Sequence, residues 1–261
     1  MKINFIRRVI TLSILTLFLL GNFKICEILV GDLSSSVLFG KISLSDPFAV
    51  LQIIFTGFGV GVSAISGALI VLIFYALIAP RAFCGWVCPV NLITDFANFI
   101  RKKFGFYENF IKISPKFRYL TLILSLIMSS ALGIQAFENI SQVGALTRSI
   151  VFLSADFFGI FIVIFAIDCF LGERLICSNI CPLGAFYAFV GRFSLIRIFH
   201  TSKNCTKCMK CKAVCPEKHV LEQIAKKDFK ISSECISCGR CVDVCADNAL
   251  NFNIQNLKEK K

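Results

Sequence analysis

Eight of the fourteen cysteines stand near the C-terminal end in two runs of identical spacing. The first run is Cys205-x2-Cys208-x2-Cys211-x3-Cys215-Pro216, and the second is Cys235-x2-Cys238-x2-Cys241-x3-Cys245. Three closely spaced thiolates can bind three corners of an iron–sulfur cubane, and the fourth cysteine of each run ligates the other cluster. The spacing therefore predicts two [4Fe–4S] clusters with crossed ligand sets: Cys205, Cys208, Cys211 and Cys245 for cluster 1, and Cys235, Cys238, Cys241 and Cys215 for cluster 2.

Other uses of these cysteines fit the pattern less well. Disulfides are rare in a reducing cytoplasm, and two zinc sites do not need a doubled x2-x2-x3 spacing. The clusters therefore indicate electron exchange. Two interpretations stay open for the basic side chains around the first run: they attract an acidic partner or raise the cluster potential, or they form a solvated basic loop. These side chains are Lys203, Lys207, Lys210 and Lys212.

A second cysteine motif occurs twice, as Arg81-x2-Cys84-x3-Cys88-Pro89 and as Arg174-x2-Cys177-x3-Cys181-Pro182. The arginine, both cysteines and the proline recur at a constant offset of 93 residues, which indicates an internal repeat of a two-helix unit. Cysteines four apart on a helix share one face. The motif predicts a redox or metal-binding group made of Cys84, Cys88, Cys177 and Cys181, with structural thiols beside a proline bend as the alternative.

The segments that position these cysteines are long and apolar. Of the 261 residues, 56% are hydrophobic and 17% are charged, and the mean hydropathy is +0.77. About 20 apolar residues cross a hydrocarbon core of roughly 30 Å, and segments near 9–23, 48–79, 119–137 and 150–171 qualify. We expect an all-α membrane domain of four transmembrane helices over residues 1–198, followed by a small α+β two-cluster bacterial ferredoxin-like domain over residues 199–261.

The basic residues predict how these segments are oriented. Of the 28 Lys and Arg residues, 25 lie in 1–8, 80–118 and 172–261. Because cytoplasmic loops are enriched in Lys and Arg, both termini are expected in the cytoplasm, with outer loops at 24–47 and 138–149. The predicted location is a bacterial inner membrane that the chain crosses several times. This asymmetry also accounts for the net charge of +12, so no nucleic-acid partner is expected.

Ionisable residues within or next to the apolar segments are candidates for proton transfer. Asp168 and Glu173 fall toward the predicted inner surface, and Glu138 and Asp156 toward the outer surface. Both histidines of the chain lie outside the four segments. A membrane-spanning haem b with two histidine ligands is therefore not expected.

Taken together, these motifs resemble the NapH family, the membrane ferredoxin-type subunits of the quinol dehydrogenase that serves periplasmic nitrate reductase. The resemblance covers nearly the whole chain, and the stretches FCGWVCPVNLITD and CSNICPLGAFYAFVGRFSLIRI carry it together with the two cysteine runs. It implies a quinol dehydrogenase subunit that oxidises menaquinol or ubiquinol from the quinone pool. Electrons would pass to a NapG-like iron–sulfur subunit, and then to a periplasmic cytochrome and the nitrate reductase.

A quinol site needs a proton acceptor near the quinol headgroup. An inner site with Asp168 as its catalytic residue shortens the distance to the predicted clusters, and an outer site at Glu138 and Asp156 is the alternative. Two other functions also stay open. One is an electron donor for the maturation or assembly of another redox enzyme, as in methylamine utilisation or copper-enzyme assembly, and the other is a scaffold whose clusters stabilise the fold.

Overall fold

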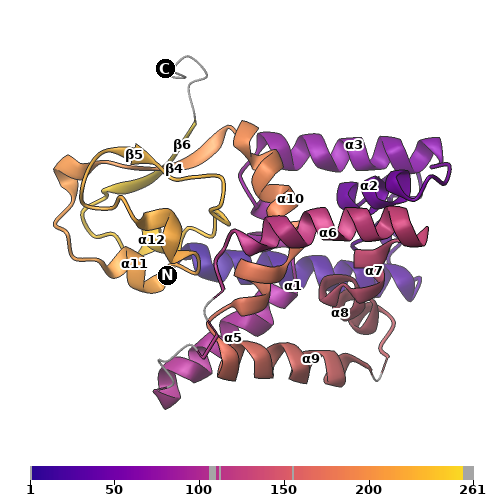
Figure 1. Ribbon diagram of the computed structural model, residues 1–261, viewed down its shortest axis with the longest axis horizontal. Helices are drawn as coiled ribbons and strands as arrows, with labels where there is room; N and C mark the ends of the chain where they lie inside the picture. The colour runs from indigo at the N-terminus through magenta and orange to yellow at the C-terminus, as the bar shows by residue number, and fades with distance from the viewer. Residues whose placement is uncertain (1, 106–109, 112, 155, 255–261) are drawn as a thin grey trace. The chain divides into compact units, whose positions relative to one another are not determined.

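The computed structural model describes residues 2–105, 110–111, 113–154 and 156–254 (Figure 1). The described residues form two compact units: a central unit within the ranges 11–72 and 88–186, and a C-terminal unit within the ranges 2–10, 73–87 and 187–254. The helices are α1 (Lys2–Asn22), α2 (Pro47–Phe55), α3 (Val62–Leu77), α4 (Ala82–Trp86), α5 (Val90–Phe104), α6 (Phe117–Leu132), α7 (Ala136–Ile140), α8 (Gln142–Val151), α9 (Asp156–Ala166), α10 (Pro182–Val190), α11 (Lys210–Val214) and α12 (Arg240–Asp243). Two π-helical turns (Ile167–Leu171 and Ile176–Ile180) and three 3₁₀ turns (Gly191–Phe193, Ser202–Asn204 and Lys218–Leu221) add to these. The strands are β1 (Leu29–Gly31), β2 (Ser35–Leu38), β3 (Ile42–Ser45), β4 (Ile196–His200), β5 (Phe229–Lys230) and β6 (Leu250–Ile254).

The central unit packs short helices around aromatic side chains. Helix α2 begins at Pro47, which lacks the N–H that a first helical residue leaves unpaired, and the Asp46 carboxylate accepts a hydrogen bond from the Phe48 amide. The fully buried Phe48 ring lies 5.5 Å from the ring of Phe137 and 5.4 Å from that of Phe186. Helix α2 packs on α6, and α9 packs on both α5 and α8.

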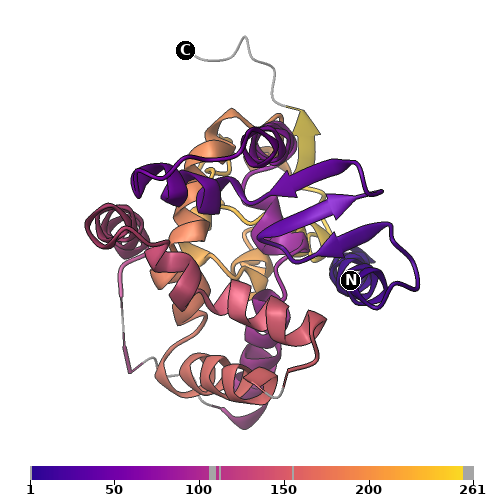
Figure 2. The ribbon, with the colours of Figure 1, turned by 90° about the vertical axis from the view of Figure 1, so that its right-hand side faces the viewer.

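An antiparallel meander of β1, β2 and β3 belongs to the same unit (Figure 2). Leu29 pairs with Leu38, and Ser35 pairs with Ser45. The Asn22 side chain, at the end of α1, donates to the Gly31 carbonyl at 2.7 Å and accepts from its amide at 3.1 Å. The segment 24–47, expected to be an outer loop, therefore contains a small sheet.

The expected all-α domain of four transmembrane helices is wrong. Among the described residues, α1 is the one helix long and apolar enough to cross a membrane: it has 21 residues and contains an 18-residue stretch with a mean hydropathy of 1.8. The expected second span divides into α2 and α3, because the chain turns at Gly57 with φ of +80°. Averaging hydropathy along 48–79 does not reveal this turn, since every residue in it is uncharged.

The other two expected spans are also shorter than a membrane requires. Helix α6 has 16 residues and ends where Gly133 adopts a left-handed φ of +63°. Sixteen residues rise by about 24 Å, which is less than the roughly 30 Å of a hydrocarbon core. The expected fourth span, 150–171, is shared among the end of α8, helix α9 and the π-helical turn Ile167–Leu171.

The C-terminal unit contains a second antiparallel sheet, with the order β5-β4-β6. Ile198 on β4 pairs with Phe252 on β6, and His200 pairs with Phe229 on β5. Helices α11 and α12, which contain the third cysteine of each run, lie side by side (Figure 1). The core between these elements combines aliphatic side chains with cysteines: Ile198, Val220, Leu221, Ile224, Ile231, Leu250, Cys215, Cys235 and Cys241.

Candidate functional site

The two cysteine runs have the same backbone conformation. Lys207 and Ser237, which precede the second cysteine of each run, have φ values of +59° and +52°. Met209 and Gly239, which follow that cysteine, have φ values of +58° and +69°. When residues of left-handed and right-handed conformation alternate, the backbone curls so that its side chains and N–H groups face one concave side. Each run therefore forms a tight loop before its short helix.

Each loop borders a cavity, and the two cavities are lined by different sets of four cysteines. The first is lined by Cys205, Cys208, Cys211 and Cys245, and the second by Cys215, Cys235, Cys238 and Cys241. The fourth cysteine around each cavity thus comes from the other run. Within the described residues, no three Cys, His, Asp or Glu side chains converge closely enough to hold a single metal ion. Four thiols around a cavity suit a cluster with several irons better than a lone ion.

The surroundings of the second cavity favour thiolates that are bound to metal. Burial raises the pKa of the Cys235 thiol to about 12, and burial also raises the pKa values of Cys215 and Cys241 well above the usual range. The Ser237 amide donates to the Cys235 sulfur at 3.4 Å. Buried thiolates are costly unless cations neutralise them, and iron does so. These residues therefore fit an iron–sulfur cluster.

The two sets of cysteines differ in exposure. Cys208 is exposed, and Cys205, Cys211 and Cys245 are half-buried. All four cysteines of the second set are buried. The first cavity lies close to the surface, whereas the second is covered by other parts of the C-terminal unit.

Residues 80–87, which include the first Cys-x3-Cys-Pro motif up to Val87, lie against the second loop. Arg81 forms a buried ion pair with Glu217 at 2.6 Å and donates to the Glu234 carbonyl at 2.8 Å. The Trp86 indole donates to the Ser237 carbonyl at 3.0 Å. A Cβ atom on Gly85 would lie 2.2 Å from the Ile236 carbonyl oxygen, so glycine permits the close approach. Sequence analysis missed this contact, although the repeated arginine was a signal for it.

The two arginines of the repeat have matching local structures. Arg81 and Arg174 both adopt left-handed backbones, with φ of +46° and +54°, and both are buried. Within the central unit, Arg174 forms an ion pair with Asp95 and donates to the Asn91 side chain at 3.0 Å. In each copy, therefore, a buried carboxylate holds the arginine that precedes the cysteines.

The cysteines of the repeat do not occupy one continuous helix face. Cys84 lies in α4, and Cys88 lies beyond the end of α4, directly before Pro89. Cys177 lies in the π-helical turn Ile176–Ile180, and Cys181 follows that turn. Cys88 is buried, and the other three are half-buried. A redox or metal-binding role for these four cysteines stays a prediction.

The candidate proton acceptors have different environments. Asp168 is fully buried, and its Oδ1 accepts a hydrogen bond from the Ile176 amide at 3.4 Å. Its Oδ2 has no hydrogen-bond partner among the described residues. Asp156, by contrast, is exposed at the start of α9, and Glu173 is half-buried.

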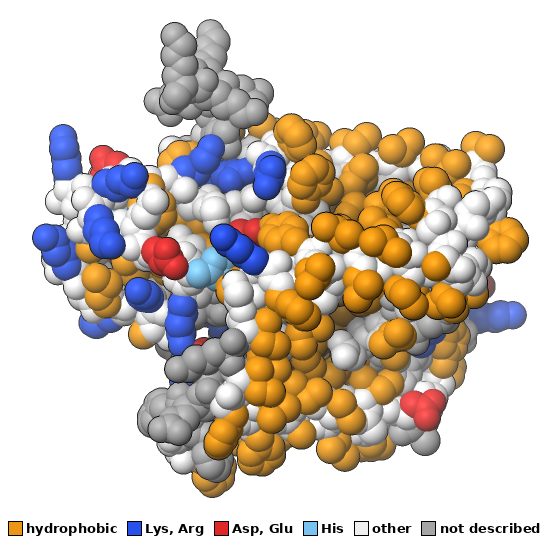
Figure 3. All heavy atoms as spheres, in the orientation of Figure 1, with side chains coloured by type: hydrophobic (Ala, Val, Ile, Leu, Met, Phe, Trp, Pro, Cys, Tyr) orange, Lys and Arg blue, Asp and Glu red, His pale blue; other side chains and the backbone are white. Residues whose placement is uncertain are grey.

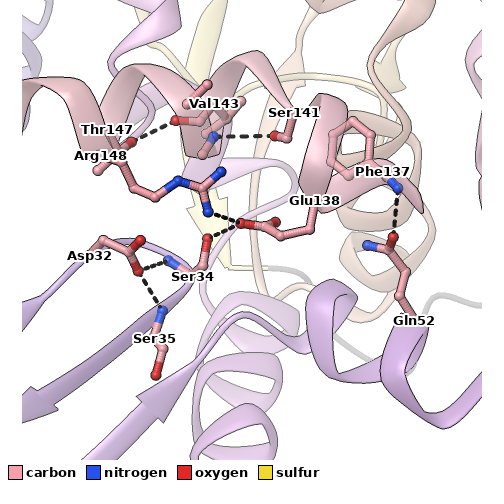
Figure 4. A network of polar contacts seen from close by, with 12 residues as sticks. Asp32, Ser34, Ser35, Gln52, Phe137, Glu138, Ser141, Val143, Thr147 and Arg148 are labelled. Atoms are coloured by element: carbon pink, nitrogen blue, oxygen red, sulfur yellow. Dashed lines mark hydrogen bonds and ion pairs between the residues drawn. The ribbon is translucent and has the colours of Figure 1, made fainter. Parts of the chain in front are cut away.

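Glu138 belongs to a structural network within the central unit (Figure 4). Its Oε1 accepts from the Ser34 hydroxyl at 2.6 Å and from Arg148 at 3.3 Å. Beside it, the Phe137 amide donates to the buried Gln52 side chain at 2.9 Å. These contacts join α2, α7, α8 and the meander, so the Glu138 carboxylate has a structural role.

Comparisons with known proteins agree with this site. A 4Fe-4S binding domain matches residues 60–107 and 156–199, and a 4Fe-4S dicluster domain matches residues 197–246. The ferredoxin-type protein NapH of Haemophilus influenzae is 40% identical over 83% of this chain and 76% of its own length. NapH of Escherichia coli is 36% identical over 83% and 75%, and the methylamine utilization ferredoxin-type protein MauN of Paracoccus denitrificans is 36% identical over 83% and 76%. No solved structure matches.

The sequence similarity to these relatives extends over 83% of the chain. The domain matches identify the iron–sulfur group as 4Fe–4S. NapH and MauN relatives are similar to this chain to nearly the same degree, so the comparison identifies the family and does not distinguish between NapH and MauN. The chain therefore belongs to the family of ferredoxin-type proteins that includes NapH and MauN, and it is an iron–sulfur electron-transfer protein.

Proposed function

We propose that the C-terminal unit holds two [4Fe–4S] clusters with crossed ligands. Cys205, Cys208, Cys211 and Cys245 would bind cluster 1, and Cys215, Cys235, Cys238 and Cys241 would bind cluster 2. The observation that carries this proposal is the pair of cavities, each lined by three cysteines of one run and one of the other. When bound, the clusters take up and release single electrons.

Iron analysis and spectroscopy of matched variants test this assignment. Anaerobically prepared protein should contain about eight irons per chain. Cys215→Ala should remove the paramagnetic signal of cluster 2, and Cys245→Ala should remove that of cluster 1. The reverse pattern, or loss of one cluster in both variants, would contradict the crossed ligand sets.

We further propose that the chain is a membrane-attached subunit that takes electrons from quinol and passes them to a NapG-like iron–sulfur partner, for delivery to a periplasmic cytochrome and nitrate reductase. The NapH relatives and the apolar helix α1 support this role. Exposed apolar side chains also cover α6 (Figure 3), where they would contact lipid. Five of them are more than half exposed: Leu120, Ile123, Leu124, Ile127 and Leu132.

The clusters would face the cytoplasm, on the inner side of a bacterial inner membrane. The Ile3 and Asn4 amides donate to the Asp243 carboxylate at 3.0 and 3.3 Å. The start of α1 and the cysteine runs are therefore on one side of any bilayer that α1 crosses. Lys2, Arg7 and Arg8 favour the cytoplasmic side for this end. The last residues, 255–261, lie outside the described part of the chain.

Within this function, Asp168 is the proposed proton acceptor for quinol. Its support is a buried carboxylate whose Oδ2 has no hydrogen-bond partner among the described residues. The contacts of Glu138 and the exposure of Asp156 make those residues weaker candidates. Arg101 donates to the Asp168 carbonyl at 3.4 Å and holds the turn in place.

The test compares quinol-dependent cluster reduction in Asp168→Asn and Asp156→Asn, with the iron content measured in both. Asp168→Asn should lower the initial rate at least about tenfold, as expected for loss of a proton-transfer group. Asp156→Asn should leave the rate within about twofold. Loss in the Asp156 variant alone would refute the inner site. Failure of menaquinol and ubiquinol to reduce the wild-type chain, with its partner present, would refute quinol oxidation itself.

A second candidate function is favoured by the MauN relatives, which are as similar to this chain as some NapH proteins are. In that role the same clusters would supply electrons for a methylamine utilization system. Deletion of the gene would then impair growth on methylamine and leave periplasmic nitrate reduction unchanged.

A further inference from the structure

Cluster 2 is enclosed within the C-terminal unit. Residues 80–87 cover its loop on one side, where Trp86 and Arg81 hydrogen-bond to the loop backbone. The start of α1 covers it elsewhere, and a Cβ on Gly239 would lie 2.6 Å from the Ile3 side chain. The Asp243 carboxylate, two residues after Cys241, caps the first amides of α1. A separate protein therefore has no short path to this loop.

The loop of cluster 1, by contrast, is exposed and positively charged. Cys208 is exposed, and Met209, which also lines the cavity, is 45% exposed. Residues 201–215 contain no Asp or Glu. They contain four lysines that are all exposed: Lys203, Lys207, Lys210 and Lys212. Lys and Arg side chains gather over the part of the molecule that Figure 1 labels α11 and β5 (Figure 3).

An exposed apolar side chain with a rim of one charge is the usual design of a transient redox interface. The apolar centre excludes water at the point of closest approach, and the charged rim steers a partner of opposite charge. Flexible methionine adapts to different partner surfaces. Here the centre would be Met209 beside Cys208, and the rim would be the four lysines. One carboxylate, that of Asp247, also lines the cavity, where it accepts a hydrogen bond from the Thr206 hydroxyl.

We propose that the cluster 1 loop is the docking surface for an acidic one-electron carrier, and that cluster 2 exchanges electrons inside this chain. This rests on the proposed two-cluster function. In each encounter the carrier gains one electron and cluster 1 loses one, while no bond forms or breaks and no proton moves. Electrons would then leave the chain through the exposed cluster.

The experiment uses the full-length chain in lipid nanodiscs and flavodoxin, an acidic one-electron carrier, as the probe. Affinity is measured by biolayer interferometry, and carbodiimide cross-links between lysines and carboxylates are mapped by mass spectrometry. The test variant carries Lys→Glu at positions 203, 207, 210 and 212. The matched control carries the same change in net charge at four exposed lysines outside the cysteine runs: Lys24, Lys41, Lys103 and Lys116.

We expect the test variant to bind flavodoxin at least about tenfold more weakly than wild type at low ionic strength. The control should bind within about threefold of wild type, and wild-type cross-links should map to the four loop lysines. Equal weakening in both variants, cross-links elsewhere, or no binding by wild type would overturn the docking surface. Iron content and spectra are recorded throughout, so that failure of the two-cluster function is seen separately as missing iron.

A lipid surface is the competing partner for these lysines. Amine labelling of the chain is therefore compared in nanodiscs of neutral and of anionic lipid, with and without flavodoxin. Protection by flavodoxin in both lipids supports the proposal. Protection by anionic lipid alone would overturn it, because the loop would then be a membrane contact.

Discussion

The ion pair between Arg81 and Glu217 allows a demanding test of how the C-terminal unit is held together. Both side chains are almost completely buried, at 1% and 3% exposure, and their charged atoms lie 2.6 Å apart. Arg81 also donates to the Glu234 carbonyl, directly before Cys235. Replacing Arg81 with Met leaves the Glu217 carboxylate buried without this partner.

The free-energy cost of replacing Arg81 follows from the burial of this ion pair. Breaking a buried pair by removing one partner costs about 3–5 kcal/mol. Since each 1.4 kcal/mol is about a factor of ten, opening of the contact between residues 80–87 and the cluster 2 loop should become about 140- to 3,700-fold more frequent. The double variant Arg81→Met/Glu217→Met removes both charges, and it should recover most of the loss.

Amide hydrogen exchange measured by mass spectrometry reports this opening. Peptides covering 81–87 and 235–239 should exchange faster in Arg81→Met by the factor above. The control is Arg148→Met, which breaks the pair with Glu138, where Arg148 is 41% exposed. An exposed pair contributes about 0–1 kcal/mol, so exchange near residue 148 should rise less than about tenfold.

Two results would refute the reasoning. Exchange in Arg81→Met as slow as in wild type would mean that the buried pair does not hold the contact. Alternatively, the double variant could exchange as fast as the single one. Packing of the arginine stem, rather than an uncompensated charge, would then explain the effect.

Two further predictions concern the same unit. Gly85→Ala should raise amide exchange in the cluster 2 loop, because the new Cβ would clash with the Ile236 carbonyl oxygen. Gly59→Ala should leave exchange in this loop unchanged, because no atom lies within 4 Å of the position of its Cβ. Equal effects of the two substitutions would argue against the close approach at Gly85. After iron is removed under reducing conditions, brief alkylation at pH 8 should modify Cys235 at least about tenfold more slowly than the exposed Cys208. The reason is that the thiolate is the nucleophile, and burial raises the pKa of Cys235 to about 12. The alkylation rate of Cys235 should rise with pH. Similar alkylation rates of Cys235 and Cys208 at pH 8 would contradict a buried second cavity.

The assignment of the cysteines to two clusters is a prediction from the sequence, and it depends on local spacing. A loop of seven residues can present three thiols to one cluster whatever the rest of the chain does. The pairing of Cys215 with the second run and of Cys245 with the first also followed from spacing, and the lining of the two cavities agrees with it. Helix α1 was predictable too, since its hydropathy is high over 18 consecutive helical residues.

Helix lengths in the central unit were decided by the tertiary structure. Hydropathy averages over a window and does not register a turn made of apolar or small residues. Gly57 and Gly133, with their positive φ values, end the regular helix inside or near segments that read as continuous spans. The meander of β1 to β3 was missed because its strands are three or four residues long.

The exposure of each cluster site also depended on contacts between distant residues. Spacing makes the two cysteine runs equivalent, yet Arg81 and Trp86, more than 130 residues away in sequence, cover one loop and leave the other open. Such contacts depend on how the whole chain folds, because each partner alone is an ordinary arginine, tryptophan or glutamate. The sequence by itself predicts which thiols bind iron, because that depends on local spacing, and the tertiary structure decided which of the two proposed cluster sites lies at the surface.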